Sequence, residues 1–165
     1  MFSTVNEFLE EWKMEAGITQ KVLEAVTDES LNKEVSPGLY SIGSLAWHLA
    51  GSVYYFPEVA GIKVEHPDME QKGQPDSAQE ILDTYKTISS NLMGALPEQV
   101  SDEQLSEEKD FFGMNMKTAD ILRLLIQHQA HHRGQLSTLM RQNGLKVPGI
   151  YGPSKEEWEA MQSQQ

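Results

Sequence analysis

Residues 118–142 read TADILRLLIQHQAHHRGQLSTLMRQ, and this stretch contains three of the five histidines of the chain. Its apolar residues recur with the period of an amphipathic helix. The pattern predicts one inward-facing stripe, made of Ile121, Leu125, His128, His132, Gln135 or Leu136, and Leu139. We expect this helix to be capped by Thr118 and to end near Gln142, before Asn143-Gly144. Two histidines therefore occupy positions where a core residue is expected.

His128 and His132 are four residues apart, so both imidazoles lie on one face of the helix and can reach the same metal ion. A pair of this spacing is equally compatible with buried histidines satisfied by hydrogen bonds. A metal site therefore requires a third ligand. The neighbouring His131 is rotated by about 100° on the helix, so we expect it to contact another helix or solvent.

The third candidate is His48, which lies in the amphipathic stretch SIGSLAWHLA at residues 41–50. A lone histidine among apolar residues is more often a packed core residue than a ligand. If both helices face the same interior, however, three neutral imidazoles converge and leave coordination positions open for water or substrate. His66, which is followed by Pro67, is expected to be an exposed loop histidine.

Composition restricts the classes of function. The chain has 165 residues, which fits a single domain over 1–165, and it has no cysteine. Disulfides, thiolate metal sites and cysteine nucleophiles are therefore excluded, and any metal must be held by nitrogen and oxygen. Twenty-five acidic against 13 basic residues give a net charge of −12, which argues against nucleic acid as a partner.

The sequence shows neither a secretory signal pattern nor a run of about 20 apolar residues, so we expect a cytoplasmic protein without a membrane partner.

Three further long helices are predicted by apolar periodicity, over about residues 3–27, 41–58 and 77–96. Ser41 is a candidate N-cap, and Ser77 with Glu80 has the capping-box pattern. The polar stretch 61–76 reads as a long crossover, and 97–117 as an irregular segment with at most a turn or short hairpin. Ser154 with Glu157 predicts a short last helix. The expected fold is all-α: a four-helix bundle with one long crossover and a short C-terminal helix.

Several of these residues occur together in a family of bacterial proteins. The chain resembles the DinB/YfiT-like family, which takes its name from damage-inducible genes, in His48, His128-x-x-x-His132-Arg133-Gly134-Gln135 and the trailing Gly144, Pro148 and Tyr151-Gly152. The resemblance spans nearly the whole chain. It implies an up-down-down-up bundle, a divalent metal bound by His48, His128 and His132, and a possible homodimer. Zinc and nickel are the favoured metals, and iron and manganese also suit three imidazoles.

The resemblance also implies a class of reaction, since members of the wider superfamily transfer or isomerise groups with bacillithiol, mycothiol or glutathione. Our hypothesis is a thiol-dependent, bacillithiol-type S-transferase acting on a small-molecule substrate. Trp47 and Tyr151 are candidate lining residues of the substrate pocket. Arg133 could also line it, but we favour a structural role in which it anchors the helix by pairing with a carboxylate.

Two alternatives remain open: a metal-dependent hydrolase, which needs the same ligands, and a non-catalytic metal-binding stress protein. Gln129 follows His128 where the H-E-x-x-H motif has glutamate, which excludes the zincin class and leaves no assigned general base.

Overall fold

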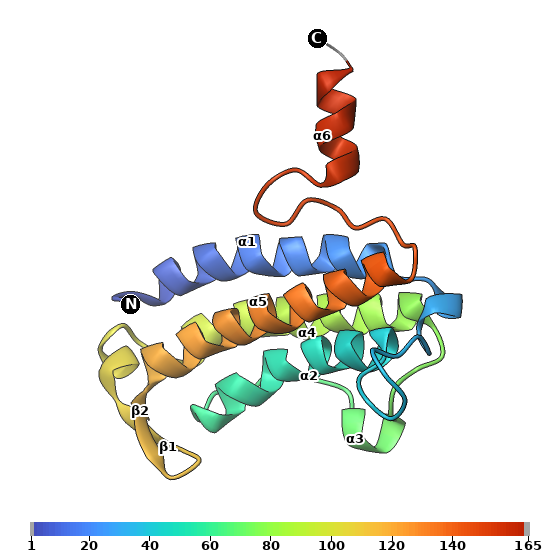
Figure 1. Ribbon diagram of the computed structural model, residues 1–165. Coiled ribbons are helices and arrows are strands. Elements are labelled where there is room, and N and C mark those ends of the chain that lie inside the picture. Colours follow the sequence, from blue (N-terminus) through green and yellow to red (C-terminus); the bar gives the residue numbers. More distant parts are fainter. Residues whose placement is uncertain (1, 164–165) are drawn as a thin grey trace.

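The computed structural model describes residues 2–163 and shows a bundle of four long helices (Figure 1). These are α1 (Val5–Glu24), α2 (Ile42–Val59), α4 (Ala78–Gln99) and α5 (Thr118–Gln142). In Figure 1, α1 and α5 run in one direction, and α2 and α4 run in the other. The predicted all-α, up-down-down-up bundle is therefore confirmed.

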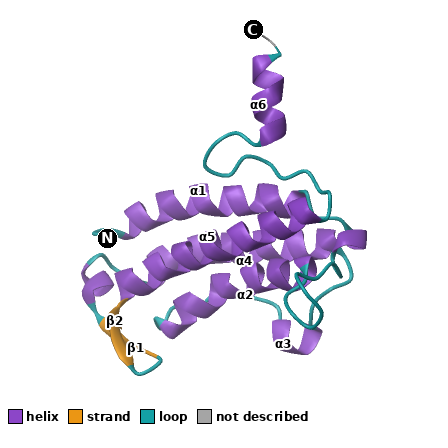
Figure 2. Cartoon of the chain, in the orientation of Figure 1, coloured by secondary structure: helices purple, strands orange, loops and turns teal. Residues whose placement is uncertain are grey.

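The connections contain the smaller elements. The crossover between α2 and α4 carries a single helical turn, α3 (Met69–Lys72), which the sequence pattern did not predict. Short 3-10 turns, η1 (Asp28–Ser30) and η2 (Glu103–Ser106), follow α1 and α4. The segment before α5 forms an antiparallel hairpin of β1 (Glu108–Phe111) and β2 (Met114–Lys117), in agreement with the expected turn or short hairpin (Figure 2).

Side-chain caps fix where most of the helices begin. Ser41 accepts a hydrogen bond from the Ser44 backbone at the start of α2, as predicted, and this cap holds the end of the helix nearest to His48. Ser77 caps α4, but the predicted capping box is incomplete, because the Glu80 carboxylate pairs with Lys72 at 2.6 Å.

The prediction that Thr118 caps α5 is wrong. Lys117 occupies the N-cap position, with no side-chain hydrogen bond, and Thr118 is the first helical residue. The Thr118 hydroxyl instead donates to the Glu107 carbonyl at 3.3 Å, and this bond closes the base of the hairpin. The hairpin residue before α5 thus takes the place that the sequence pattern assigned to the threonine.

The core lies between the inner faces of the four helices, with α1 and α2 each packed against both α4 and α5. Trp12 on α1 is fully buried, and its indole Nε1 donates to Ser89 Oγ on α4 at 3.1 Å. The sequence pattern assigned either Gln135 or Leu136 to the inward-facing stripe of α5. Leu136 is fully buried and Gln135 is exposed, so the stripe contains Leu136. Because α2 and α5 are neighbours, residues 80 positions apart in the chain can form one site.

The C-terminal helix α6 (Lys155–Gln162) extends away from the bundle in Figure 1 and buries none of its residues. Its capping box, formed by Ser154 and Glu157, is present as predicted. The Arg141 guanidinium Nη2, at the end of α5, donates to the Glu156 carboxylate at 2.7 Å and holds α6 near the bundle. Among residues 2–163, no helix has both the length and the apolar character needed to cross a membrane.

Two glycines with opposite surroundings test this packing. At Gly43, near the start of α2, an added Cβ would lie 3.0 Å from the Leu31 carbonyl oxygen and 2.3 Å from the Gln74 amide nitrogen. Gly43→Ala is expected to lower the free energy of unfolding by about 1–3 kcal/mol through overpacking. Gly94→Ala, on an exposed and open face of α4, should raise it by about 0.5–1 kcal/mol. Urea unfolding measures both, and equal effects would contradict the described start of α2.

Candidate metal centre

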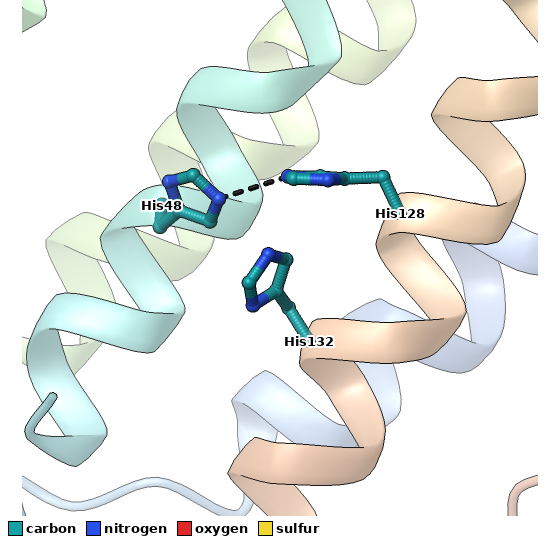
Figure 3. A group of neighbouring side chains, drawn as sticks. All are labelled: His48, His128 and His132. Carbon is teal, nitrogen blue, oxygen red and sulfur yellow. Dashed lines mark hydrogen bonds between the residues drawn. The ribbon is translucent and has the colours of Figure 1, made fainter.

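Three histidines from two helices converge on one point between α2 and α5. His48 projects from α2, and His128 and His132 project from α5 into the same gap (Figure 3). The Nε2 atoms of His48 and His128 are 2.8 Å apart. One nitrogen from each of the three rings can be chosen so that all lie within 4.8 Å of one another. The structure thus brings together the three residues that the sequence analysis proposed as metal ligands.

The register of the two helices is fixed beside the histidines by Gln129, which is fully buried. Its amide nitrogen donates to the Leu49 carbonyl and to Ser52 Oγ on α2, both at 2.8 Å. Its amide oxygen accepts from the Tyr85 hydroxyl of α4 at 3.1 Å. Because Leu49 adjoins His48 in the chain and Gln129 adjoins His128, these bonds hold the two ligand-bearing turns together. Gln129 is therefore a core residue, which agrees with the exclusion of the zincin class.

The three imidazoles differ in burial, since His48 is exposed, His128 is half-buried and His132 is buried, yet partial desolvation lowers the pKa of all three. Burial lowers the pKa of His128 to about 4, with further lowering by any positive charge on His132, His48 and His131. Burial also lowers the pKa of His48, as does a charge on His132, and it lowers the pKa of His132. At neutral pH each ring therefore has a free nitrogen lone pair, which is the form that binds a metal ion.

Gln135 fixes the tautomer of His132. The Nδ1 atom of His132 donates to the Gln135 amide oxygen at 2.7 Å, which leaves Nε2 of His132 as the nitrogen with a lone pair. The amide nitrogen of Gln135 donates in turn to Nε2 of His131 at 3.1 Å. His131 is exposed to solvent, which is one of the two surroundings expected for it. Its hydrogen-bond partner Gln135 lies on its own helix and not on another one. Partners of this kind orient metal-binding histidines in known sites.

These donors fit a divalent metal ion. Three neutral nitrogen donors suit zinc, nickel, iron or manganese, and a set of three leaves coordination positions for another ligand. Ligands of this type do not discriminate among these metals. The distance of 2.8 Å between Nε2 of His48 and Nε2 of His128 also fits a hydrogen bond between two neutral imidazoles, in which one ring donates and the other accepts.

A cavity of about 490 Å³ adjoins the histidines and is lined by His48, His128 and mainly apolar side chains. Trp47, predicted as a pocket residue, lies in its wall. Tyr151 does not: it lines a separate hollow formed by the end of α5 and the C-terminal loop. The Tyr151 hydroxyl is instead held by Glu15, at 2.8 Å from its carboxylate, on the α1 side of the bundle. Tyr151 therefore holds the loop that follows α5 against α1.

Glu15, the partner of Tyr151, forms a buried ion pair with Arg133 inside the bundle. Arg133 is fully buried, and its Nη2 lies 2.7 Å from the carboxylate of Glu15, which is also buried. The expected pairing of Arg133 with a carboxylate is thus present, and the guanidinium also donates to Thr19 Oγ1 at 2.9 Å. Arg133 is turned toward α1, whereas the adjacent His132 is turned toward α2. Arg133 anchors α5 and does not line the cavity.

His66 is half-buried, which differs from the exposed loop position expected for it. Its ring stacks on Tyr54 with centroids 3.6 Å apart, and its Nε2 lies 3.3 Å from the Glu58 carboxylate. His66 thus supports the wall of the cavity from behind, because Tyr54 is one of the residues that line it.

Two functional features were not predicted from the sequence. The first is the role of Gln135, although its spacing of three residues from His132 on a helix was visible. The second is the aromatic wall, whose residues come from separate elements. They are Tyr54, Tyr55 and Phe56 of α2, and Phe112 of the hairpin.

The fold and the site together define a class: up-down-down-up helical bundles with three converging histidines beside an apolar cavity. The comparisons with known proteins agree with that class. The model of the DinB family matches residues 1–165, so the chain belongs to the DinB family.

The similarity extends to individual relatives. The chain is 44% identical over 158 residues to the uncharacterised protein YrdA of Bacillus subtilis strain 168, which covers 96% of this chain and 94% of that protein. The crystal structure of a DinB-like protein from Bacillus cereus shares 40% identity, has a TM-score of 0.86 and covers 92% of this chain and 100% of its own. That of YjoA, a DinB-like protein from Bacillus subtilis, supports the fold alone, with 20% identity, a TM-score of 0.66 and coverage of 87% and 96%.

The buried ion pair can be tested through stability. Glu15→Gln leaves the Arg133 charge buried without a counter-charge, so we expect the free energy of unfolding to fall by about 3–5 kcal/mol. Tyr151→Phe removes only hydrogen bonds and should cost about 1–2 kcal/mol. The control is Glu11→Gln, which breaks the more exposed Glu11–Arg123 pair and should cost less than about 1 kcal/mol. Urea unfolding at pH 7 compares the three, and equal losses for the two glutamates would contradict the buried network.

Proposed function

We propose that this protein is a divalent-metal-dependent enzyme that transfers a low-molecular-weight thiol, of the bacillithiol type, to a small-molecule electrophile. The observation that carries the proposal is the convergence of three neutral imidazoles at the edge of a substrate-sized cavity. Membership of the DinB family supports it, and the absence of cysteine is compatible with it, because the reacting sulfur would belong to a cosubstrate. Zinc or nickel is the favoured ion, with iron or manganese as further candidates.

A divalent ion held by His48, His128 and His132 would supply Lewis acidity, which lowers the pKa of a thiol near it. The residues of the chain have separate tasks. Gln135 keeps His132 in the tautomer that presents Nε2, and Gln129 keeps α2 and α5 in register. The cavity beside His48 and His128 holds the electrophile out of bulk water.

In the proposed reaction the thiol gives its proton to solvent. The sulfur lone pair then forms a bond to the electrophilic carbon, while the bond from that carbon to the leaving group breaks and the leaving group departs with its electron pair. No oxidant or reductant is required. The products are a thioether and the leaving-group anion.

Hydrolysis is the second candidate, because a water molecule can use the same coordination position. One observation makes it the weaker candidate: among residues 2–163, no carboxylate hydrogen-bonds to any of the three histidines, and the only carboxylate that lines the cavity is Glu70. A purely structural site is disfavoured by the apolar core, which fills the bundle without help from an ion, whereas metal storage stays open as a non-catalytic alternative. The proposal also includes a cytoplasmic location, where low-molecular-weight thiols are kept reduced, and a possible homodimer.

Metal content tests the site. Protein purified without a histidine tag should contain close to one equivalent of metal by elemental analysis. His48→Ala, His128→Ala and His132→Ala should each lose it while keeping the circular dichroism of a helical bundle. His131→Ala and His66→Ala are matched controls that should retain the metal. Gln135→Leu should weaken metal affinity by roughly 10-fold to 100-fold. A wild-type protein that stays empty after incubation with zinc and nickel would refute the proposed site.

Activity tests the reaction. The metal-loaded protein should accelerate the conjugation of 1-chloro-2,4-dinitrobenzene with bacillithiol, glutathione or cysteine, followed by absorbance. The acceleration should require metal and disappear in the three histidine variants, because each loses one of the ligands. Release of nitrophenol from 4-nitrophenyl acetate without any thiol reports hydrolysis. Hydrolysis in the absence of thiol transfer would replace the first candidate with the second.

A further inference from the structure

We propose that the cavity beside His48 and His128 selects an apolar or aromatic small molecule that is neutral or cationic, and that it excludes anions. The inference rests on the proposed function in one respect: under that function, the selected molecule is the electrophile. The selectivity itself follows from the wall of the cavity. Its argument depends on shape, on charge and on the position of the histidines.

The wall is largely aromatic, and its apolar residues come from three parts of the chain. Helix α2 contributes Trp47, Tyr54, Tyr55 and Phe56, α3 contributes Met69, and the hairpin contributes Phe112. A cavity of about 490 Å³ lies within the range that holds small-molecule ligands. An aromatic ring placed there would face flat apolar surfaces, which favour an aromatic or aliphatic group over a strongly hydrated one.

The hairpin places an aromatic residue at the mouth of the cavity. Phe112 is 71% exposed and has a positive φ of 53°, at the tip between β1 and β2. Its ring stacks near Tyr55, with centroids 6.4 Å apart. The left-handed φ belongs to the two-residue turn that Phe112 forms with Gly113, and this turn holds the exposed ring beside the cavity. A bound apolar ligand would cover part of its surface.

The charge of the wall is negative. Among the described residues 2–163, no lysine or arginine lines the cavity, and Glu70 on α3 is its only charged lining residue. The nearby Lys72 is already paired with Glu80 at 2.6 Å, and within residues 2–163 Glu70 has no ion-pair partner. The pKa of Tyr54 is raised first by burial and then by the carboxylates of Glu58, Glu70 and Asp68. In the metal-free protein, an anion entering this space would lose its hydration without gaining a cationic partner among the lining side chains.

The aromatic faces, together with the unpaired carboxylate, can instead accept a cation. His48 and His128 lie in the same wall, so a ligand that fills the cavity presents one end to the three-histidine site. In the proposed reaction that end carries the electrophilic carbon. The apolar body of the substrate would then account for its binding, and the histidine end for its reaction.

Binding of matched probes to the metal-free protein tests the selectivity. Isothermal titration of 2-naphthalenemethanol, 2-naphthylmethylammonium and 2-naphthoate compares a neutral, a cationic and an anionic ligand with the same ring. We expect the first two to bind at least about tenfold more tightly than 2-naphthoate. Equal or tighter binding of the anion would overturn the inference.

Three substitutions, one of them a control, locate the bound probe. Gly51→Leu puts a side chain into the cavity from α2, where an added Cβ would meet only Met69 at 3.8 Å, and should abolish binding of all three probes. Gly94→Leu, on the exposed and open face of α4, is the matched control and should leave binding unchanged. Glu70→Gln should weaken the cation and leave the neutral probe unaffected. Unchanged binding in Gly51→Leu would place the probes elsewhere and overturn the inference.

The same variants separate this inference from the proposed function. Metal content of Gly51→Leu, measured alongside, should equal that of the wild type, because the substitution leaves all three histidines in place. Probe binding with the expected preference, but without thiol transfer, would support the selectivity and refute the proposed reaction. Thiol transfer that proceeds as fast to the anionic 4-chloro-3-nitrobenzoate as to neutral 4-chloro-3-nitrobenzamide would refute the selectivity and support the reaction.

Discussion

The geometry of this bundle depends on the buried amide of Gln129. Its two polar atoms reach the other three long helices: Leu49 and Ser52 on α2, Tyr85 on α4, and Thr19, at 3.3 Å, on α1. A buried amide without partners is costly, so slippage of α5 by one residue would leave several of these groups unsatisfied. Apolar packing alone tolerates such shifts more easily. The amide thus specifies the register at the level of the histidines.

Neighbouring residues of helix α5 point to three different parts of the structure. His128 and His132 face α2, while Gln129 and Arg133, each one position further on, face the core and α1. Gln135 lies on the outer side, where it bonds to the ring of His132. All three candidate ligands thus lie on helices, and the His132 ring is oriented by Gln135, so the site does not depend on loops for its shape. A buried Arg133–Glu15 pair on the opposite side of the same turn fixes the helix against rotation.

Periodicity is a local property, which explains what could be predicted. The four long helices, the hairpin-sized irregular segment and the convergence of His48, His128 and His132 were all readable from spacing and resemblance, although His48 is exposed and not in the interior expected for it. The prediction that Tyr151 lines the substrate pocket was wrong. Its partner Glu15 lies 136 positions away in the chain, and no local sequence pattern shows that pairing. The cavity wall was also out of reach, since Phe112 meets Tyr55 only through the fold of the hairpin. Thr118 does not cap α5, because its hydroxyl donates a hydrogen bond to the Glu107 carbonyl at the base of the hairpin.

The three tryptophans lie in three different surroundings. Trp12 is fully buried in the core with its indole bonded to Ser89, Trp47 is half-buried in the cavity wall, and Trp158 is 54% exposed on α6. Indole emission shifts to longer wavelength as solvent exposure increases, so the three tryptophans are expected to differ in emission maximum and in access to a soluble quencher. A soluble quencher would reach Trp158 first. It would reach Trp47 when no ligand fills the cavity, and Trp12 only when the protein unfolds. The chain therefore carries its own optical reporters for the tail, the cavity and the core.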